Sequence, residues 1–416
     1  MLTILVNSFA CSPDMGSEPG MAWNWCINLA KYCELHIITE EGYKNKIEKA
    51  LPHLPQRNNM HFYYNPLSEK AREMCENQGD WRFYKHYKQW QKRTCAMALD
   101  IIANNRIDIV HQLNMIGFRE PGYLWKIAGI PFVWGPVDAK ETFPVAYLKG
   151  LPKKQQLFIR LKNLITKLQL SYSFRVRSAV KRASYVVSAS SESVKSFFKY
   201  FDLYSPLINE TGCYSNEKET DCPKKSDKNT FDILWVGQLY ARKQLALAIK
   251  TIAKLHHLEQ MKLHIVGGGN ADEYQALAAS LNISDRCCWY GAISHQEVQK
   301  IMKNSDILFF TSVAEGTPHA VLEAISNCLP VVCFNCCGQG DSVNEKVGVK
   351  IKLSHPQQSV GEFAEKIEYL YHHRELLEEM SQNCVPRQQE LSWDNKAKQM
   401  ITLYNRAIDK FKQTSK

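Results

Sequence analysis

The sequence predicts an α/β fold made of two doubly wound domains, each with a parallel sheet. Short apolar runs alternate with segments of helical spacing, which is typical of parallel strands covered by helices. The alternation stops in the polar stretch 206–230 and then restarts. The 416 residues exceed one ordinary domain, and 45% hydrophobic with 23% charged residues is a globular composition. We therefore expect a domain over 1–205, a linker over 206–230 and a domain over 231–391.

The first domain begins with a strand over 2–6, a loop that carries Gly16 and a helical segment up to Ala30. Glycine in such a loop lets the backbone approach a ligand closely. The expected strands of this domain are 2–6, 35–39, 62–64, 108–111, 131–134 and 185–188. The loop lacks the G-x-G-x-x-G fingerprint, so no dinucleotide cofactor is expected.

The second domain restarts with a strand over 232–236 and a basic loop over 237–243, and a strand over 263–266 then ends at Gly267. Further on, apolar runs over 306–311 and 330–334 predict two buried strands around a helix over 319–326. Pro318 suits the first helical position because its missing N–H costs nothing there. A strand that delivers a loop into a helix is where a doubly wound sheet binds its ligand.

The start of the helix over 319–326 is a natural seat for phosphate, because its first amides and its dipole favour an anion. Two carboxylates flank this seat, Glu315 in the loop and Glu323 in the second helical turn. Carboxylates repel phosphate, so we expect them to accept hydrogen bonds from hydroxyl groups, as on a sugar and a ribose. An ordinary solvated helix face is the alternative.

The stretch E-G-T-P-H-A-V-L-E-A resembles the paired-glutamate motif of retaining GT-B glycosyltransferases, family 4 above all. The resemblance implies two Rossmann-like domains that face each other across a cleft. It also implies that the first Glu contacts the donor sugar and the second the ribose, and that the terminal helical segment 392–416 packs back on the first domain. The segment G-S-E-P-G-x-x-W-x-W is similar to one subgroup of bacterial family-4 enzymes.

In the resembling family an Arg follows the glycine of the first loop of the second domain, a Lys lies five residues further on, and both clamp the diphosphate. Lys243 occupies the Lys position, but Gln238 stands where the Arg is expected, and Arg242 is the candidate replacement. The candidate catalytic residues are Glu315, Lys243, Arg242 and His111. The candidate donor-binding residues are Gly16, Gln238, Gly267, Gly316, Thr317, His319, Ala320 and Glu323.

His111 is a candidate because the family often carries a functional His after the corresponding strand. A lone His at a strand end is usually structural, so both interpretations stay open. Asn114, Arg119 and Asp138 also sit at expected strand ends and are candidates for contacting the acceptor.

The net charge of 52 − 42 = +10 suggests an anionic partner: nucleotide phosphates, a membrane surface or nucleic acid. Two stretches are rich in basic residues. Residues 68–104 interleave aromatic and basic side chains, and residues 151–182 place leucines at helical spacing among nine Lys and Arg. Each is either a helix with an inward apolar face or a surface for anionic lipid, and we expect no nucleic-acid partner.

The fourteen cysteines lie mostly in apolar runs and are interpreted as reduced thiols in a cytosolic protein, peripheral to the membrane if the basic stretches bind lipid. The C-x-x-C at 333–336 has no second pair at metal spacing, so no zinc site is expected. The start of the chain lacks the features of a signal peptide, and no run is long enough to span a bilayer.

The predicted function is transfer of a sugar from a UDP- or GDP-sugar to an acceptor hydroxyl. Retention at the anomeric carbon, and a role in lipopolysaccharide, capsule or exopolysaccharide synthesis, are implied by the resemblance. No metal or cofactor is expected, because no D-x-D pair is evident and the basic loop can do a cation's work. Gln238 motivates an alternative, a non-catalytic scaffold or regulatory subunit of the same fold, and an epimerase or phosphorylase is a further one. The sequence does not identify the sugar, the base or the acceptor.

Overall fold

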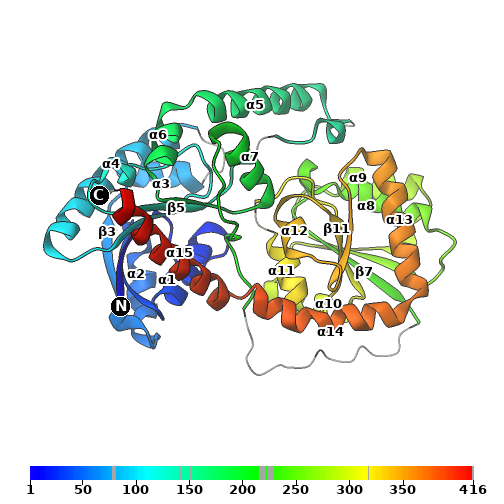
Figure 1. Cartoon of the computed structure of the whole chain (residues 1–416). Coiled ribbons are helices and arrows are strands. Elements are labelled where there is room, and N and C mark those ends of the chain that lie inside the picture. The colour runs from blue at the N-terminus through cyan, green and yellow to red at the C-terminus, as the bar shows by residue number, and fades with distance from the viewer. Residues whose placement is uncertain are drawn as a thin grey trace. The chain divides into compact units, whose positions relative to one another are not determined.

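The computed structural model describes residues 1–76, 81–140, 142–149, 151–214, 222, 229–316 and 318–414. The chain forms two compact units, each assembled from separate segments (Figure 1). Unit 1 comprises Met1–Glu141, Thr166–Thr211 and Trp393–Lys416, and unit 2 comprises Thr142–Ile165 and Gly212–Ser392. Residues 206–211 of the expected linker therefore belong to unit 1, and 142–165 belong to unit 2.

Unit 1 is built on a six-stranded sheet with the order β3-β2-β1-β4-β5-β6, in which all pairs are parallel. Its strands are β1 (Leu2–Ser8), β2 (Cys33–Glu40), β3 (Met60–Asn65), β4 (Ile109–Asn114), β5 (Phe132–Val137) and β6 (Tyr185–Ser188). Its main helices are α1 (Ser17–Leu29), α2 (Lys44–Ala50), α3 (Glu69–Glu76), α4 (Phe83–Asn104), α6 (Phe174–Arg182), α7 (Ser191–Phe201) and α15 (Trp393–Thr414).

Both faces of this sheet are buried, because alternate residues of β1 point into two different cores. Ile4 and Val6 belong to the core that includes residues of α1 and α15, whereas Leu5 belongs to the core that includes residues of α4 and α7. This is why the strands read as continuous apolar runs rather than as alternating ones.

Unit 2 repeats the arrangement with the order β12-β11-β10-β7-β8-β9, again all parallel. Its strands are β7 (Phe231–Val236), β8 (Met261–Val266), β9 (Cys287–Gly291), β10 (Ile307–Phe310), β11 (Val331–Phe334) and β12 (Gly348–Ile351). Its helices are α8 (Leu245–Lys254), α9 (Asp272–Ser280), α10 (His295–Asn304), α11 (His319–Ser326), α12 (Cys337–Ser342), α13 (Pro356–His372) and α14 (Arg374–Glu390). Helix α5 (Lys153–Tyr172) begins in a segment of unit 2 and ends in a segment of unit 1.

In both sheets the chain first adds strands on one side of the first strand and then crosses to the other side. The crossing falls between β1 and β4 in unit 1 and between β7 and β10 in unit 2. Loops that leave two such strands diverge, and the crevice at their carboxyl ends is where open α/β sheets bind ligands.

Several expected elements differ in the structure. The helical stretch 68–104 contains two described helices, α3 and α4, and residues 77–80 lie outside the described part. The strand expected over 108–111 continues to Asn114. Pro318 is not the first residue of α11 but the capping residue before it, and the helix begins at His319.

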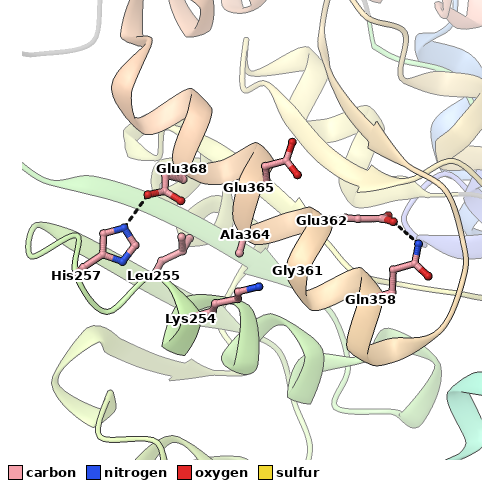
Figure 2. Close-up of a pocket in the computed structure, with 9 residues that line it drawn as sticks. All are labelled: Lys254, Leu255, His257, Gln358, Gly361, Glu362, Ala364, Glu365 and Glu368. Atoms are coloured by element: carbon pink, nitrogen blue, oxygen red, sulfur yellow. Dashed lines mark hydrogen bonds and ion pairs between the residues drawn. The ribbon is translucent and has the colours of Figure 1, made fainter.

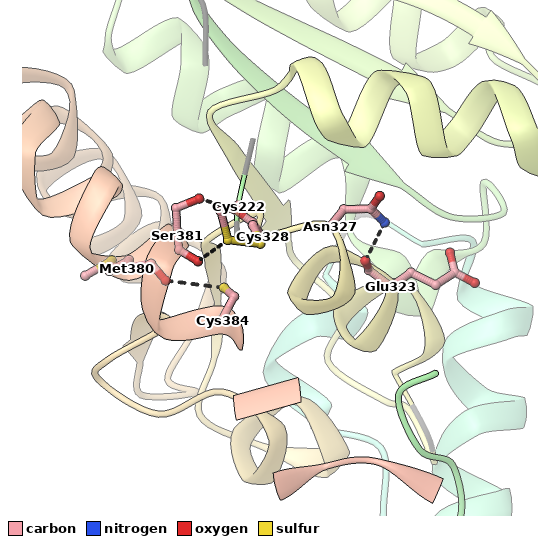
Figure 3. The surroundings of a disulfide bond; sticks show 7 residues. All are labelled: Cys222, Glu323, Asn327, Cys328, Met380, Ser381 and Cys384. Carbon is pink, nitrogen blue, oxygen red and sulfur yellow. Dashed lines mark hydrogen bonds between the residues drawn. A yellow bond between two sulfur atoms is a disulfide. The ribbon is translucent and has the colours of Figure 1, made fainter. Parts of the chain in front are cut away.

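The expectation that the cysteines are all thiols is wrong for one pair. Cys222 and Cys328 form a disulfide that joins residues 106 apart, and the other twelve cysteines remain thiols. Cys328 lies just after α11, where its carbonyl accepts a hydrogen bond from Ser381 Oγ at 2.5 Å (Figure 3). None of the helices described combines the length and the apolar character needed to traverse a bilayer.

Candidate functional site

The candidate site lies in unit 2 at the carboxyl ends of β7 and β10, the two strands between which the chain crosses over. The loop after β7 ends in a short 3₁₀ turn, Ala241–Lys243, and the loop after β10 carries Glu315. The structure thus brings together three of the predicted catalytic residues, Arg242, Lys243 and Glu315, although 72 residues separate Lys243 from Glu315.

Glu315 is the centre of an ion cluster. Its Oε2 lies 2.6 Å from Arg242 Nη1, its Oε1 contacts Lys243 Nζ, and Oε1 also accepts a hydrogen bond from Ser312 Oγ at 2.8 Å. The Glu315 side chain is 8% exposed and that of Lys243 13%, whereas that of Arg242 is 40% exposed. Two cations therefore converge on one buried carboxylate.

The pKa values of the cluster follow from this arrangement. Burial alone would raise the pKa of Glu315, but the charges of Lys243 and Arg242 outweigh it, so the pKa lies below its usual range. Burial also lowers the pKa of Lys243, and the neighbouring Glu315 opposes that shift. The carboxylate is thus held ionised next to an ammonium group that has lost much of its water.

The backbone of the basic loop is fixed by hydrogen bonds from the end of β10. Thr311 Oγ1 donates to the carbonyl of Lys243 at 2.7 Å and accepts from Trp235 Nε1 at 2.9 Å. The carbonyl of Arg242 accepts from the amide of Val313 at 3.0 Å and also lies 3.2 Å from Ser312 Oγ. Hydrogen bonds to the main chain of their turn therefore place the two cations, which do not depend on their long side chains alone.

Gly267 is required by a close approach of two loops. Its φ is +153°, and a Cβ at this position would lie 1.8 Å from the carbonyl oxygen of Gly237. The next residue, Gly268, lies against the Gln238 side chain, which a Cβ on Gly268 would meet at 3.1 Å. Gln238 thus sits at the carboxyl ends of β7 and β8 and brings a polar amide where the resembling family has a cation.

Helix α11 opens from the same crevice. Gly316 and Pro318 lie against α12, since a Cβ on Gly338 would be 2.8 Å from the Gly316 carbonyl oxygen and 2.7 Å from Pro318 Cδ. His319 and Ala320 are the first two helical residues, and no acidic residue occupies the first turn. Thr317 lies outside the described residues. The first turn of the helix thus carries no acid of its own, which favours an anion, and the nearby charge of Glu315 is opposed by Lys243 and Arg242.

Glu323 has a different environment from Glu315. Its Oε1 lies 3.4 Å from Nε2 of His295, which is 71% exposed, and the Glu323 side chain is itself 35% exposed. Burial raises its pKa, against the opposing effect of His295. Without a strong cation nearby, this carboxylate can accept hydrogen bonds from hydroxyl groups of a ligand.

The structure adds two residues that are not among the predicted site residues, Ser312 and Gln339, although the stretch 338–342 after the strand over 330–334 was a candidate for lying near the base or ribose. Gln339 Nε2 donates to the Ser312 carbonyl at 2.9 Å, and its buried Oε1 has no hydrogen-bond partner in the described part of the chain. Both follow strands of the sheet, Ser312 after β10 and Gln339 after β11. A position directly after a strand of the sheet indicates a possible site residue, but neither side chain carries a charge that would single it out in the sequence.

The candidates of unit 1 occupy quite different surroundings. His111 is fully buried within β4, where Nε2 contacts the Gly135 carbonyl at 2.6 Å and Nδ1 contacts the Tyr404 hydroxyl at 2.6 Å. Burial lowers the pKa of His111 to about 4, against the bond to Gly135. With both ring nitrogens engaged inside the core, its geometry is that of a structural histidine.

The remaining candidates of unit 1 lie near the carboxyl ends of β1, β4 and β5. Asn114 Nδ2 donates to the Ala10 carbonyl at 2.9 Å, and its Oδ1 is buried with no hydrogen-bond partner among the described residues. Arg119 donates to the Thr166 and Gln169 side chains, both at 2.6 Å. Asp138 accepts from Ser193 Oγ at 3.0 Å, and burial raises its pKa against that bond.

Gly16 is the capping residue of α1, and a Cβ there would meet nothing within 4 Å. Two positions further on, Glu18 Oε1 accepts from the Ile116 amide at 2.7 Å, which ties the loop after β1 to the loop after β4. Burial raises the pKa of Glu18, although this hydrogen bond opposes the shift. Glu18 is the charged member of the quoted G-S-E-P-G segment and was not chosen as a site residue.

A surface hollow of about 490 Å³ lies elsewhere in unit 2, between α8 and α13 (Figure 2). Glu362, Glu365 and Glu368 line it, and Glu368 pairs with His257 at 2.7 Å. Three carboxylates would repel a phosphate, so this hollow does not suit a nucleotide.

In unit 1, Glu34, His36 and His61 bring potential metal-ligand atoms within 4.8 Å of one another, near the starts of β2 and β3. That is the end of the sheet opposite to the loops described above.

Residues 216–384 match the family described as "Glycosyl transferases group 1". Over 179 residues the chain is 25% identical to an uncharacterized glycosyltransferase of Methanocaldococcus jannaschii, which covers 42% of this chain and 45% of that protein. Over 117 residues it is 32% identical to lipopolysaccharide 1,6-galactosyltransferase of Salmonella typhimurium. This alignment covers 27% of this chain and 32% of that protein. The matches thus span less than half the length of these relatives.

Among solved structures, HepE of Anabaena in complex with UDP aligns with a TM-score of 0.62 at 14% identity, over 97% of this chain and 100% of that one. The fold is accordingly that of the GT-B glycosyltransferases, as predicted. The match to the glycosyl transferases group 1 family falls within the range of unit 2.

Proposed function

We propose that the chain is a glycosyltransferase that moves a sugar from a nucleotide diphosphate sugar to an acceptor hydroxyl, with retention at the anomeric carbon. The observation that carries this proposal is the convergence of Arg242 and Lys243 on Glu315 at the crossover of the unit 2 sheet. The group 1 match over the same unit supports it, as do relatives described as acting in lipopolysaccharide synthesis.

The chemistry that these residues can support is stabilisation of a leaving group. The bond between the anomeric carbon and the diphosphate oxygen breaks, and the oxygen keeps the electron pair. The acceptor oxygen then bonds to the anomeric carbon, and its proton passes to the departing diphosphate oxygen. Lys243, Arg242 and the amides that open α11 would face the diphosphate as its charge grows. Preorganised donors of this kind are worth roughly 3 kcal/mol each.

The ion cluster explains how such cations are kept in place before a donor binds. Glu315 holds both of them, and main-chain contacts from β10 fix the turn that carries them. An entering diphosphate would compete with Glu315 for the same cations, and the released carboxylate could then accept hydrogen bonds from the donor sugar. Glu323, which lacks a strong cationic partner, suits the ribose hydroxyls. No metal takes part in this proposal.

The donor class we propose is a UDP- or GDP-sugar, and the acceptor is a saccharide or lipid-linked saccharide of a surface polysaccharide. The site of action is then the inner face of the plasma membrane. The structural likeness to HepE, solved with UDP, is consistent with a uridine donor. His111 has no part in the proposed reaction, because both its ring nitrogens are engaged inside the core.

A non-catalytic protein of the same fold remains the second candidate, and Gln238 is the observation that favours it. The test is donor hydrolysis and transfer by the purified chain with a panel of UDP- and GDP-sugars. Turnover that falls at least about a hundredfold in Lys243→Met, but not in the surface control His257→Ala, would support the enzyme. Binding of UDP or GDP that depends on Lys243 without any turnover would support the non-catalytic protein.

A further inference from the structure

Helix α5 places its apolar face outward. At about 100° per residue, seven large apolar side chains fall within an arc of about 120°. All seven are between 43% and 78% exposed. They are Leu157, Phe158, Leu161, Leu164, Ile165, Leu168 and Tyr172. The two buried residues of α5, Thr166 and Leu170, lie on the opposite side of the helix. This is the reverse of a helix that packs its apolar face on a core.

Four of the five cations of α5 border this face. On the same helical wheel, Lys153, Arg160 and Lys167 line one edge of the apolar arc and Lys162 the other, whereas Lys154 lies within the arc at the start of the helix. From residue 153 to 182 the chain carries nine Lys and Arg and no acidic residue. An outward apolar stripe bordered by bases is the pattern of a helix that lies in the interface of an anionic bilayer.

We propose that the outward face of α5 docks on a membrane surface that contains anionic lipid. The leucines and Phe158 would enter the boundary between headgroups and acyl chains, and the bordering cations would contact the lipid phosphates. Charge argues against a second copy of this chain as the occupant, because pairing two such faces would bring the same bases together without acids to neutralise them. This inference rests on the surface of α5 and not on the transfer reaction.

The experiment measures co-sedimentation of the full chain with vesicles of phosphatidylcholine, alone and mixed with phosphatidylglycerol. Binding to the mixed vesicles should be at least about tenfold tighter and should weaken with added salt. Equal binding to both kinds of vesicle, or binding to neither, would overturn the proposal.

Matched variants assign the binding to α5. Leu161→Gln should weaken it about tenfold, whereas Leu99→Gln on α4 should change it less than about twofold, although both leucines are 53% exposed. The pair Lys153→Gln and Arg160→Gln should weaken binding about 25-fold, at about fivefold for each cation. The control pair Lys300→Gln and Lys303→Gln on α10 removes the same charge and should have little effect.

The thermal unfolding midpoint of each variant separates lipid from protein as the occupant. Because Leu161 is exposed, its replacement should leave the midpoint unchanged. A lower midpoint together with unchanged vesicle binding would mean that protein covers this face, and the proposal would fail. Hydrolysis of a donor in the absence of vesicles should be the same in the α5 variants as in the native chain, so failure here is distinct from failure of the proposed function.

Discussion

Replacing Glu315 by Gln should destabilise unit 2, because the change removes the only carboxylate that the described structure places against Lys243 and Arg242. Lys243 is 13% exposed, so its ammonium group would remain in a poorly hydrated position beside a like charge. Breaking a buried ion pair costs about 3–5 kcal/mol. Since Arg242 is 40% exposed and can turn toward water, we expect the lower end, about 3 kcal/mol.

The loss is best measured by native-state hydrogen exchange at the amides of β7 and β10, because the two units need not unfold together. The double variant Lys243→Met with Glu315→Gln should recover at least about 1.5 kcal/mol relative to the sum of the single changes. Glu323→Gln is the matched control. Glu323 is 35% exposed and pairs with an exposed His295, so its loss should cost less than about 1 kcal/mol. Equal costs at the two glutamates, or strict additivity in the double variant, would refute the reasoning.

Three further predictions concern the scaffold. Burial lowers the pKa of His111 from 6.5 to about 4. The contribution of the neutral His111 to the stability of unit 1 is therefore complete above pH 6.5 and is lost as the pH falls to 4. The stability of unit 1 should therefore drop by about 3 kcal/mol over that range, and His111→Gln should flatten the drop; an unchanged slope would contradict this. Reducing the disulfide should lower the unfolding free energy of unit 2 by about 2–5 kcal/mol, because it closes a long loop, and reductant should have no further effect on Cys222→Ser. Gly267→Ala should cost more than about 3 kcal/mol through its clash with the Gly237 carbonyl, whereas Gly129→Ala, at φ +80° in open space, should cost about 1 kcal/mol; similar costs would rule out the clash.

The strand–loop–helix around Glu315 was predictable because each part has its own local signal. Apolar runs mark β10 and β11, and Pro318 marks the start of α11 within one residue. The contacts within the ion cluster were harder to predict from the sequence. The sequence placed Lys243 and Glu315 in one site only through the family resemblance, and the contact of Arg242 with Glu315 depends on how two distant loops meet.

The extent of β4 was missed because its last residues are polar. Gln112 and Asn114 are fully buried in the strand, which hydrophobicity does not suggest. The structure shows why this is tolerated. Asn7 Nδ2 donates to Gln112 Oε1 at 2.8 Å and to Gln91 Oε1 at 2.7 Å, so most of these polar groups are paired, although Asn7 Oδ1 and Asn114 Oδ1 have no partner among the described residues. The pairing of Cys222 with Cys328 does not follow from local pattern, because it depends on tertiary contacts. Local pattern predicted the basic amphipathic helix over 151–182 but left open whether its apolar face points inward or outward.

The position of α15 after unit 2 in the chain has a consequence for biosynthesis. Its residues Trp393, Ala397, Met400 and Tyr404 belong to the same core as β1 and α1, which precede unit 2. All segments of unit 2 therefore leave the ribosome before α15 does, and the core of unit 1 can be completed only after that. Expression of residues 1–211 alone would leave that core open, so a dissected unit 1 needs the last 24 residues supplied in the same chain or in trans.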